Sequence, residues 1–225
     1  MFDLRAASDV SSPSSISNQM RSRRLAKFIE LIGELPLPVR ILDVGGTVGF
    51  WQDNPLVKDK SLRVVVGNLT VAISPYDNLT SVTLDATDLS RYSPGDFDVV
   101  FSNSVIEHLY TLENQRKMAA EIQRVCTRYW IQTPNYWFPI EPHFHVPGWQ
   151  WLPESIRVAM LRRVRCGWRG PCPDLAMAQN LVREVRLMTR AELTQIFPLG
   201  QIFVERFYGL PKSLVVYSGF NRSIT

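Results

Sequence analysis

The chain has 225 residues, of which 45% are apolar and 20% are charged, the balance of an ordinary globular domain. No run of about 18 uncharged apolar residues is present, which argues against a membrane-spanning helix. The net charge of +4 permits an anionic partner without requiring one. The three cysteines, Cys126, Cys166 and Cys172, form no pattern typical of disulfide frameworks or metal sites, so the simplest interpretation is a reducing cytoplasm.

The first two thirds of the chain alternate between predicted strands and helices. Residues 1–17 are rich in serine and lack the layout of a signal peptide, so we expect a flexible segment. Apolar side chains at helical spacing predict an amphipathic helix over 20–35, which two prolines end. A second helix is expected over about 112–125. Runs of β-branched residues predict strands at 39–44, 62–66, 81–84, 97–101 and 129–132. This alternation implies a parallel sheet covered on both faces.

Residues 134–186 have a different character, because they are rich in proline, tryptophan and arginine. They contain one predicted amphipathic helix, about 153–165, and we interpret the segment as a lid inserted over the active site. A helix is then expected over 189–197, with Thr189 as its N-cap. Strands at 201–207 and 213–217 close the domain, which we place at 18–225.

A glycine-rich turn directly after the first predicted strand is the clearest motif. Asp43 lies at the end of that strand, and Gly45, Gly46 and Gly49 follow it. Glycine is needed where the backbone turns tightly or approaches a ligand, and ligands bind at this edge of doubly wound folds. The spacing differs from the dinucleotide pattern G-x-G-x-x-G, and no Gly-Lys-Ser/Thr follows as in a P-loop. A purely structural turn is the alternative.

This turn resembles the first motif of the class I methyltransferases that use S-adenosylmethionine (SAM), D-x-G-x-G-x-G, with Thr47 at the middle glycine. The resemblance implies that Asp43 helps to hold the donor's amino group. It also implies that the backbone of the turn passes beneath the methionine and ribose. The fold implied is α/β and Rossmann-like, with a seven-stranded, mostly parallel sheet, helices on both faces and the lid after the fifth strand.

Three later segments resemble further motifs of the same superfamily, in the correct order. Asn68 stands where the family has an acidic residue for the ribose, and Asp85-Ala86 resembles the element that contacts adenine. The run 97–109 resembles the fourth motif of small-molecule methyltransferases, F-D-x-V-x-x-x-x-V-x-E-H. The cofactor implied is SAM, which leaves as S-adenosylhomocysteine. By resemblance its site comprises Asp43, Gly45, Gly46, Thr47, Gly49, Asn68, Asp85, Ala86, Ser102 and Asn103.

Candidate catalytic residues follow the fourth and fifth predicted strands. His143 and His145 lie close to Glu141 in an aromatic loop, which suggests a general base with an orienting partner. We rank His143 first as the base and His145 second, and His108 is expected to line the transfer site by resemblance. No cluster of carboxylates suited to Mg²⁺ is visible, so no metal is assigned. The alternative is that these polar groups only satisfy a proline-rich loop.

The run 132–143 resembles bacterial methyltransferases of the methyltransferase-11 type, some of which are associated with glycan modification. We therefore expect O-methylation of a small-molecule or saccharide hydroxyl. C- or N-methylation of a small molecule or lipid-linked acceptor is an alternative, and so is a non-catalytic SAM-binding partner subunit. The aromatic side chains of the lid suit a sugar or aromatic acceptor, or simply the lid's own core. The arginines of the lid are compatible with a solvated face, with an anionic acceptor or with peripheral contact with a membrane. These arginines are Arg157, Arg162, Arg163 and Arg165.

Other classes fit the sequence less well. The D/N-P-P-Y/F element of DNA amino-methyltransferases and the Pro-Cys of cytosine-C5 enzymes are both absent after the fourth predicted strand. No basic stripe with regular aromatic residues indicates a nucleic-acid groove, so a nucleic-acid partner is not expected. A nicotinamide dehydrogenase is disfavoured by the glycine spacing. The oligomeric state is left open.

Overall fold

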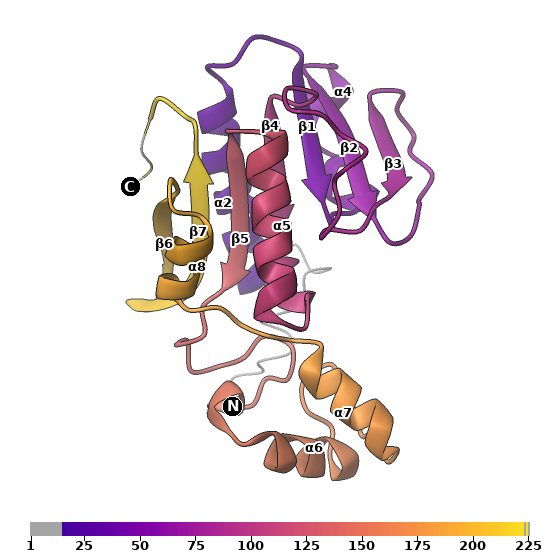
Figure 1. Ribbon diagram of the computed structural model, residues 1–225, viewed down its shortest axis with the longest axis vertical. Helices are drawn as coiled ribbons and strands as arrows, with labels where there is room; N and C mark the ends of the chain where they lie inside the picture. The colour runs from indigo at the N-terminus through magenta and orange to yellow at the C-terminus, as the bar shows by residue number, and fades with distance from the viewer. Residues whose placement is uncertain (1–14, 223, 225) are drawn as a thin grey trace.

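The computed structural model describes residues 15–222 and residue 224, and its centre is one seven-stranded sheet (Figure 1). The strand order is β3-β2-β1-β4-β5-β7-β6. Strands β1 to β5 pair in parallel, whereas β7 is antiparallel to both of its neighbours. The strands are β1 (Val39–Val44), β2 (Leu62–Asn68), β3 (Leu79–Thr83), β4 (Val99–Asn103), β5 (Tyr129–Pro134), β6 (Gln201–Phe207) and β7 (Leu210–Ser218). The predicted Rossmann-like fold class is confirmed.

Helices cover both faces of this sheet, because the parallel strands are apolar on both sides. On one face, α5 (Leu112–Val125) and α8 (Arg190–Ile196) pack on side chains such as Leu42 and Val100. On the other face, α2 (Ile16–Ile32), α3 (Val48–Trp51) and α4 (Pro55–Lys58) pack on the alternate side chains, such as Ile41 and Val99. Figure 1 shows α5 in front of the sheet and α2 behind it.

The ends of several helices follow from their caps. α2 begins at Ile16, four residues before the expected start, because the Ser15 hydroxyl accepts a hydrogen bond from the Asn18 N–H. Of the expected flexible segment 1–17, residues 1–14 lie outside the described part. Thr189 caps α8 as predicted, and Glu192 completes a capping box. The bounds of α5 and β6 agree with the expected ranges.

The segment after β5 folds around a small core of its own. It contains the 3₁₀ turn η2 (Trp149–Trp151), α6 (Glu154–Arg163) and α7 (Leu175–Arg183), with Phe144 and Trp149 at its centre. The expectation of one helix here was wrong, since the segment contains two. The second helix, α7, was missed because it is short and follows two prolines; the Asp174 carboxylate caps its first turn. Both helices lie beyond the carboxyl ends of β1 to β5 (Figure 1). Within the described residues, no helix has the length and apolar character needed to cross a membrane.

Candidate active site

The turn after β1 is built around a buried carboxylate. Asp43 is 1% exposed, and its Oδ2 accepts a hydrogen bond of 2.7 Å from the Trp51 Nε1–H of α3. Its Oδ1 is buried and has no hydrogen-bond partner among the described residues. Burial raises the pKa of Asp43 from 3.8 to about 7, against the opposing effect of the Trp51 hydrogen bond. One oxygen of this carboxylate is therefore held in place while the other is left without a partner.

Two of the three glycines of the turn are required by the fold, and the third is not. A Cβ on Gly45, whose φ is +79°, would lie 2.4 Å from a methyl group of Val105. A Cβ on Gly46 would lie 1.7 Å from Asp43 Oδ2. A Cβ on Gly49 would meet no atom within 4 Å, so the fold itself does not require glycine there. Thr47, at the middle position of the motif, precedes α3 and makes no side-chain cap.

Asn68, at the end of β2, stabilises this turn by hydrogen bonding. Its Nδ2 donates to the carbonyl of Gly46 at 2.7 Å and lies 3.4 Å from the carbonyl of Gly45. The amide nitrogen is thus engaged with the turn, which leaves Oδ1 as the atom available to a ribose hydroxyl. A carboxylate at this position has no donor to offer these carbonyls, which gives a physical reason for asparagine here.

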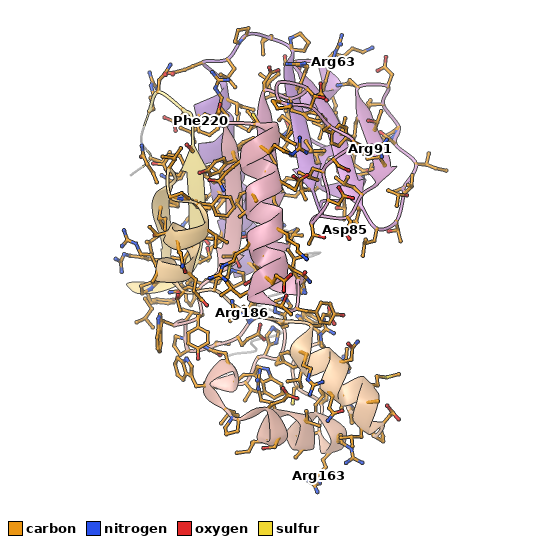
Figure 2. All side chains as sticks on the ribbon, in the orientation of Figure 1. Arg63, Asp85, Arg91, Arg163, Arg186 and Phe220 are labelled. Carbon is orange, nitrogen blue, oxygen red and sulfur yellow. The ribbon has the colours of Figure 1, made fainter. Side chains whose placement is uncertain are left out.

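The remaining residues expected at the donor site differ in how far they are exposed. Asp85 is exposed at the carboxyl edge of the sheet (Figure 2), accepts from the backbone N–H and hydroxyl of Thr87, and precedes the half-buried Ala86. Ser102 is fully buried and donates to the Val44 carbonyl at 2.8 Å, so its hydroxyl joins β4 to β1. The expected contact between Ser102 and the donor stays a prediction. Asn103 is half-buried at the end of β4.

These features fit a donor that carries a cationic amino group. Such a group would satisfy the unpartnered Asp43 Oδ1 and stabilise its charge. The space beside Gly49 lets a ligand approach the backbone closely. The carboxyl edges of β1, β2 and β4 meet here, so the expected residues Asp43, Asn68 and Asn103 end neighbouring strands.

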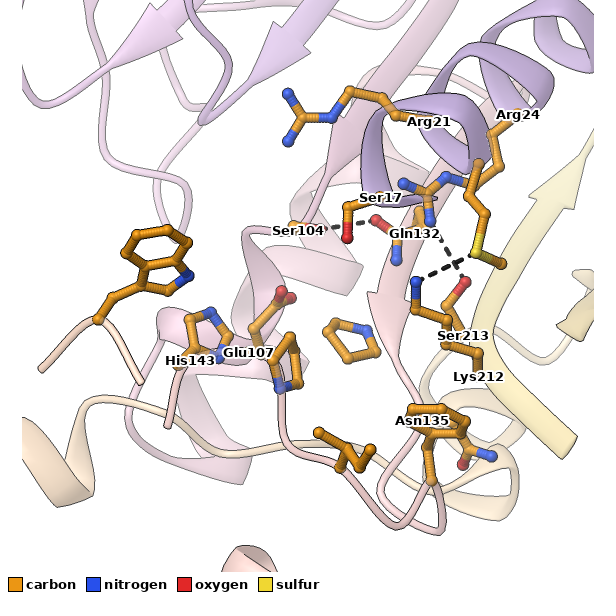
Figure 3. Close-up of a pocket in the computed structure, with 16 residues that line it drawn as sticks. Ser17, Arg21, Arg24, Ser104, Glu107, Gln132, Asn135, His143, Lys212 and Ser213 are labelled. Carbon is orange, nitrogen blue, oxygen red and sulfur yellow. Dashed lines mark hydrogen bonds between the residues drawn. The ribbon is translucent and has the colours of Figure 1, made fainter. Parts of the chain in front are cut away.

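A cavity of about 480 Å³ lies at the carboxyl ends of β4 and β5 (Figure 3). Basic side chains enter it from α2 and β7, whereas Glu107 and His143 form the opposite part of its wall. Arg24 is paired with the buried Glu205, and Lys212 is half-buried. The polar and charged residues that line the cavity are Ser17, Arg21, Arg24, Ser104, Glu107, Gln132, Asn135, His143, Lys212 and Ser213.

The fold brings three of the expected catalytic residues together in a chain of contacts. Glu141 Oε1 lies 2.5 Å from His143 Nδ1, and its Oε2 accepts from the backbone N–H groups of His143 and Phe144. His143 Nε2 lies 3.2 Å from His108 Nε2. His108 Nδ1 in turn lies 3.5 Å from Glu184, which binds both terminal nitrogens of Arg169. Glu141 is 1% exposed, so the loop holds this carboxylate rigidly beneath the imidazole.

Burial and charge move the pKa values within this array in opposite directions. Burial lowers the pKa of His143, but the hydrogen bond and charge of Glu141 outweigh burial, so the net shift is upward from 6.5. Burial and the neighbouring His143 lower the pKa of His108 to about 4. Burial raises the pKa of Glu107 to about 7. His143 is therefore the more basic ring of the facing histidine pair.

His145, the second candidate for the base, does not join the array. Its φ is +52° and its ring packs edge-on against Trp168 at 5.7 Å. Of the lid tryptophans, Trp149 is buried against Phe144, whereas Trp137 and Trp151 are exposed and lie 6.4 Å apart between ring centroids. Arg163 lies at the outer end of α6 (Figure 2), so the lid arginines do not converge on the cavity.

Two carboxylates of the array were not selected from the sequence. Glu107 lies beside His143 in the cavity wall, and its Oε2 accepts from the Thr133 hydroxyl. The glutamate of the E-H motif was the available signal. Glu184 comes from the end of α7, and no sequence pattern linked it to His108. The Arg186 N–H donates to the Glu107 carbonyl, which ties the end of the inserted segment to the site.

Comparison with known proteins agrees with this geometry. Residues 60–128 match the family model of the methyltransferase domain. Magnesium protoporphyrin IX methyltransferase from Synechocystis PCC 6803, solved with bound S-adenosylhomocysteine, is 14% identical, with a TM-score of 0.53 over 91% of this chain and 84% of that one. The chain therefore contains a segment similar to a methyltransferase domain, and its overall fold is that of the solved methyltransferase.

Two further matches are of different kinds. Geranyl diphosphate C-methyltransferase from Streptomyces coelicolor A3(2) is 11% identical, with a TM-score of 0.53 over 89% of this chain and 79% of that chain. An uncharacterized protein of Mycobacterium tuberculosis (strain ATCC 25618 / H37Rv) is 37% identical over 51 residues. That match spans 23% of this chain and 17% of the relative.

Proposed function

We propose that this protein is a SAM-dependent methyltransferase that transfers the methyl group to a hydroxyl of a small molecule or saccharide. The observation that carries the proposal is the array Glu141–His143–His108, which meets the cavity wall at the carboxyl edge of the sheet. A sulfonium methyl donor is already activated, so the protein's task is to position the acceptor and to assist removal of its proton. An amine acceptor would need no such array, whereas a hydroxyl gains from it.

In the simplest mechanism, His143 accepts the proton of the acceptor hydroxyl. The acceptor's O–H bond breaks as its proton passes to Nε2, the O–C bond forms, and the S–C bond of SAM breaks to give neutral S-adenosylhomocysteine. Glu141 stabilises the imidazolium through Nδ1. On the donor side, Asp43 would bind the amino group, Asn68 Oδ1 the ribose, and Asp85 with the backbone of Ala86 the adenine.

The test combines donor binding with acceptor screening. Calorimetric titration with SAM and S-adenosylhomocysteine, with NAD as a control, is expected to give micromolar binding of the first two alone. Transfer of a labelled methyl group is then measured with saccharides, phenols and matched amines. We expect product with a hydroxyl acceptor, and its yield is expected to fall in His143→Ala while SAM affinity stays within a few-fold. Methylation of amines alone would contradict the proposed acceptor class.

A further inference from the structure

The two facing histidines hold two ring nitrogens at a distance that calls for a proton or a metal cation between them. The Nδ1 of each ring faces a carboxylate, Glu141 at 2.5 Å and Glu184 at 3.5 Å. A ring nitrogen that faces a carboxylate carries its proton there, which leaves Nε2 as a lone pair. Two Nε2 lone pairs therefore point at each other across 3.2 Å. Lone pairs at this distance repel each other unless a cation lies between them.

A third ligand atom lies beside this pair. Glu107 is fully buried, and its Oε1 has no hydrogen-bond partner among the described residues. An unsatisfied buried carboxylate oxygen is costly, and such atoms call for an explanation. One carboxylate oxygen of Glu107 and one nitrogen each of His108 and His143 all lie within 4.8 Å of one another. Figure 3 shows Glu107 and His143 next to each other in the cavity wall.

We propose that Glu107, His108 and His143 bind a divalent transition-metal cation. Two imidazole nitrogens at about 2.1 Å from one cation, at angles between octahedral and tetrahedral, are roughly 3.0–3.4 Å apart. The observed separation of 3.2 Å is within that range, and a carboxylate oxygen of Glu107 lies within 4.8 Å of a nitrogen of each ring. Two imidazoles with one carboxylate favour Zn²⁺, Fe²⁺ or similar ions over Ca²⁺.

The surroundings of these three side chains resemble those of a metal site as well. Histidines that bind a metal usually donate their second ring N–H to a carboxylate, and Glu141 and Glu184 occupy those positions. Three protein ligands leave coordination positions open, as in catalytic zinc sites. Because Glu107 and His143 line the cavity, the open positions face the space where an acceptor would bind.

The chemical consequence of this inference rests on the proposed function, whereas cation binding does not. An acceptor hydroxyl on the cation would become more acidic, so its proton leaves to solvent and its oxygen attacks the methyl carbon of SAM. The O–C bond forms as the S–C bond breaks, and S-adenosylhomocysteine leaves. His143 would then be a ligand instead of the base, and a vicinal diol of a saccharide could occupy two open positions.

The test is metal binding by the full chain after chelator treatment. Titration with Co²⁺, followed by its visible absorption, is expected to show one equivalent per chain, which Zn²⁺ displaces. His108→Ala and His143→Ala are expected to weaken binding at least ten-fold. Glu107→Gln, which keeps the side-chain volume and the contact with Thr133, is expected to weaken it as well. His145→Ala is the matched control, because His145 is the third histidine of the chain and lies outside the array.

SAM affinity and circular dichroism verify that each variant is folded. Binding that persists in His108→Ala and His143→Ala, or that is lost equally in His145→Ala, would overturn the site. Hydroxyl methylation that survives complete chelation in a chain that takes up no Co²⁺ would overturn the cation and leave the proposed function standing. Co²⁺ binding at the three residues with methyl transfer only to amines would support the site and contradict the proposed function.

Discussion

His108 and His143 come from loops 35 positions apart, yet their Nε2 atoms lie 3.2 Å from each other. The 3₁₀ turn η1 (Ile106–His108) after β4 presents one ring, and the loop after β5 presents the other. Because β4 and β5 are neighbours in the sheet, their carboxyl ends bring the two loops together. This pairing joins two sequence motifs into one site, and the Glu141 carboxylate lies beneath the His143 ring.

Replacing Glu141 by glutamine tests whether the orienting carboxylate matters for turnover. The amide keeps the size of the side chain and an acceptor for the backbone N–H groups of His143 and Phe144, but it removes the negative charge beside Nδ1. We expect kcat to fall about 10–100-fold, as for partners that orient active-site histidines, while the SAM Kd changes little. Steady-state kinetics with calorimetry measures both. An unchanged kcat would show that Glu141 serves only the loop.

Gly49→Ala tests whether glycine at this position is required for SAM binding or for the stability of the fold. The added methyl group meets open space, and alanine favours a helix by roughly 0.5–1 kcal/mol over glycine, so thermal stability should hold or rise slightly. SAM affinity should fall at least ten-fold, because the methyl group occupies the space where the donor approaches. Gly33→Ala, at the end of α2 and also free of severe contacts, is the control and should change neither quantity. Full SAM affinity in Gly49→Ala would contradict the proposed donor position.

Asp43→Asn is expected to change how stability depends on pH. In the native state the carboxyl group stays protonated up to about pH 7, whereas in the unfolded chain it ionises near 3.8. The native state thus binds more protons over this window, so this residue lowers stability as the pH rises from about 4 to 7. The full effect has an upper bound of about 4 kcal/mol, at 1.36 kcal/mol per pKa unit.

Denaturant unfolding of the metal-free, SAM-free protein at pH 4.5 and pH 8 measures this dependence. The asparagine variant should lose less stability than the wild type between the two values. Some slope should remain, because burial also raises the pKa of Glu107. The same variant should bind SAM at least ten-fold more weakly, since the charge for the amino group is gone. Equal slopes in the two proteins would show that Asp43 is ionised throughout.

Asn68→Asp should weaken SAM binding although it restores the acidic residue typical of the family. The carboxylate would face the carbonyls of Gly45 and Gly46 without a hydrogen to donate. We expect a loss of about 1–3 kcal/mol in stability and a weaker SAM affinity. Asn68→Ala is the comparison, because it removes the donor without adding repulsion and should be less destabilised. Tighter SAM binding by the aspartate variant would show that the ribose contact outweighs the turn.

Trp149→Ala tests the inserted segment as a unit. This side chain is 1% exposed and stacks on Phe144, so its loss should cost about 3–5 kcal/mol within that small core. Hydrogen exchange should rise in α6 and α7 and remain unchanged in β1, β2 and β4. Acceptor turnover should fall while SAM binding is retained. Exchange that rises equally in the sheet would contradict a separately stabilised lid.

Local patterns in the sequence determined much of the fold and of the donor turn. Runs such as Val39–Val44 are largely apolar on both faces, which already implies a covered parallel sheet, and α5 showed its helical period. The glycine turn was recognisable because its residues are contiguous and each answers a local constraint of backbone or ligand approach. The N-cap at Ser15 and the short helix α7 depend on single hydrogen bonds, and the pattern did not reveal them.

The tertiary structure alone decided which polar side chains meet. Glu107, His108, Glu141, His143 and Glu184 come from three separate segments, and their contact depends on strand order and on the path of the inserted chain. The sequence offered both His143 and His145 as the base, with His143 first, and only the folded loop turned one ring into the array and the other toward Trp168. Asn68 was expected at the ribose, yet its amide nitrogen binds the turn, because hydrogen-bond donors pair with the nearest buried carbonyls. Long-range contacts of this kind carry no periodic signal, so the chemistry of the acceptor side became visible only once the sheet had brought its edges together.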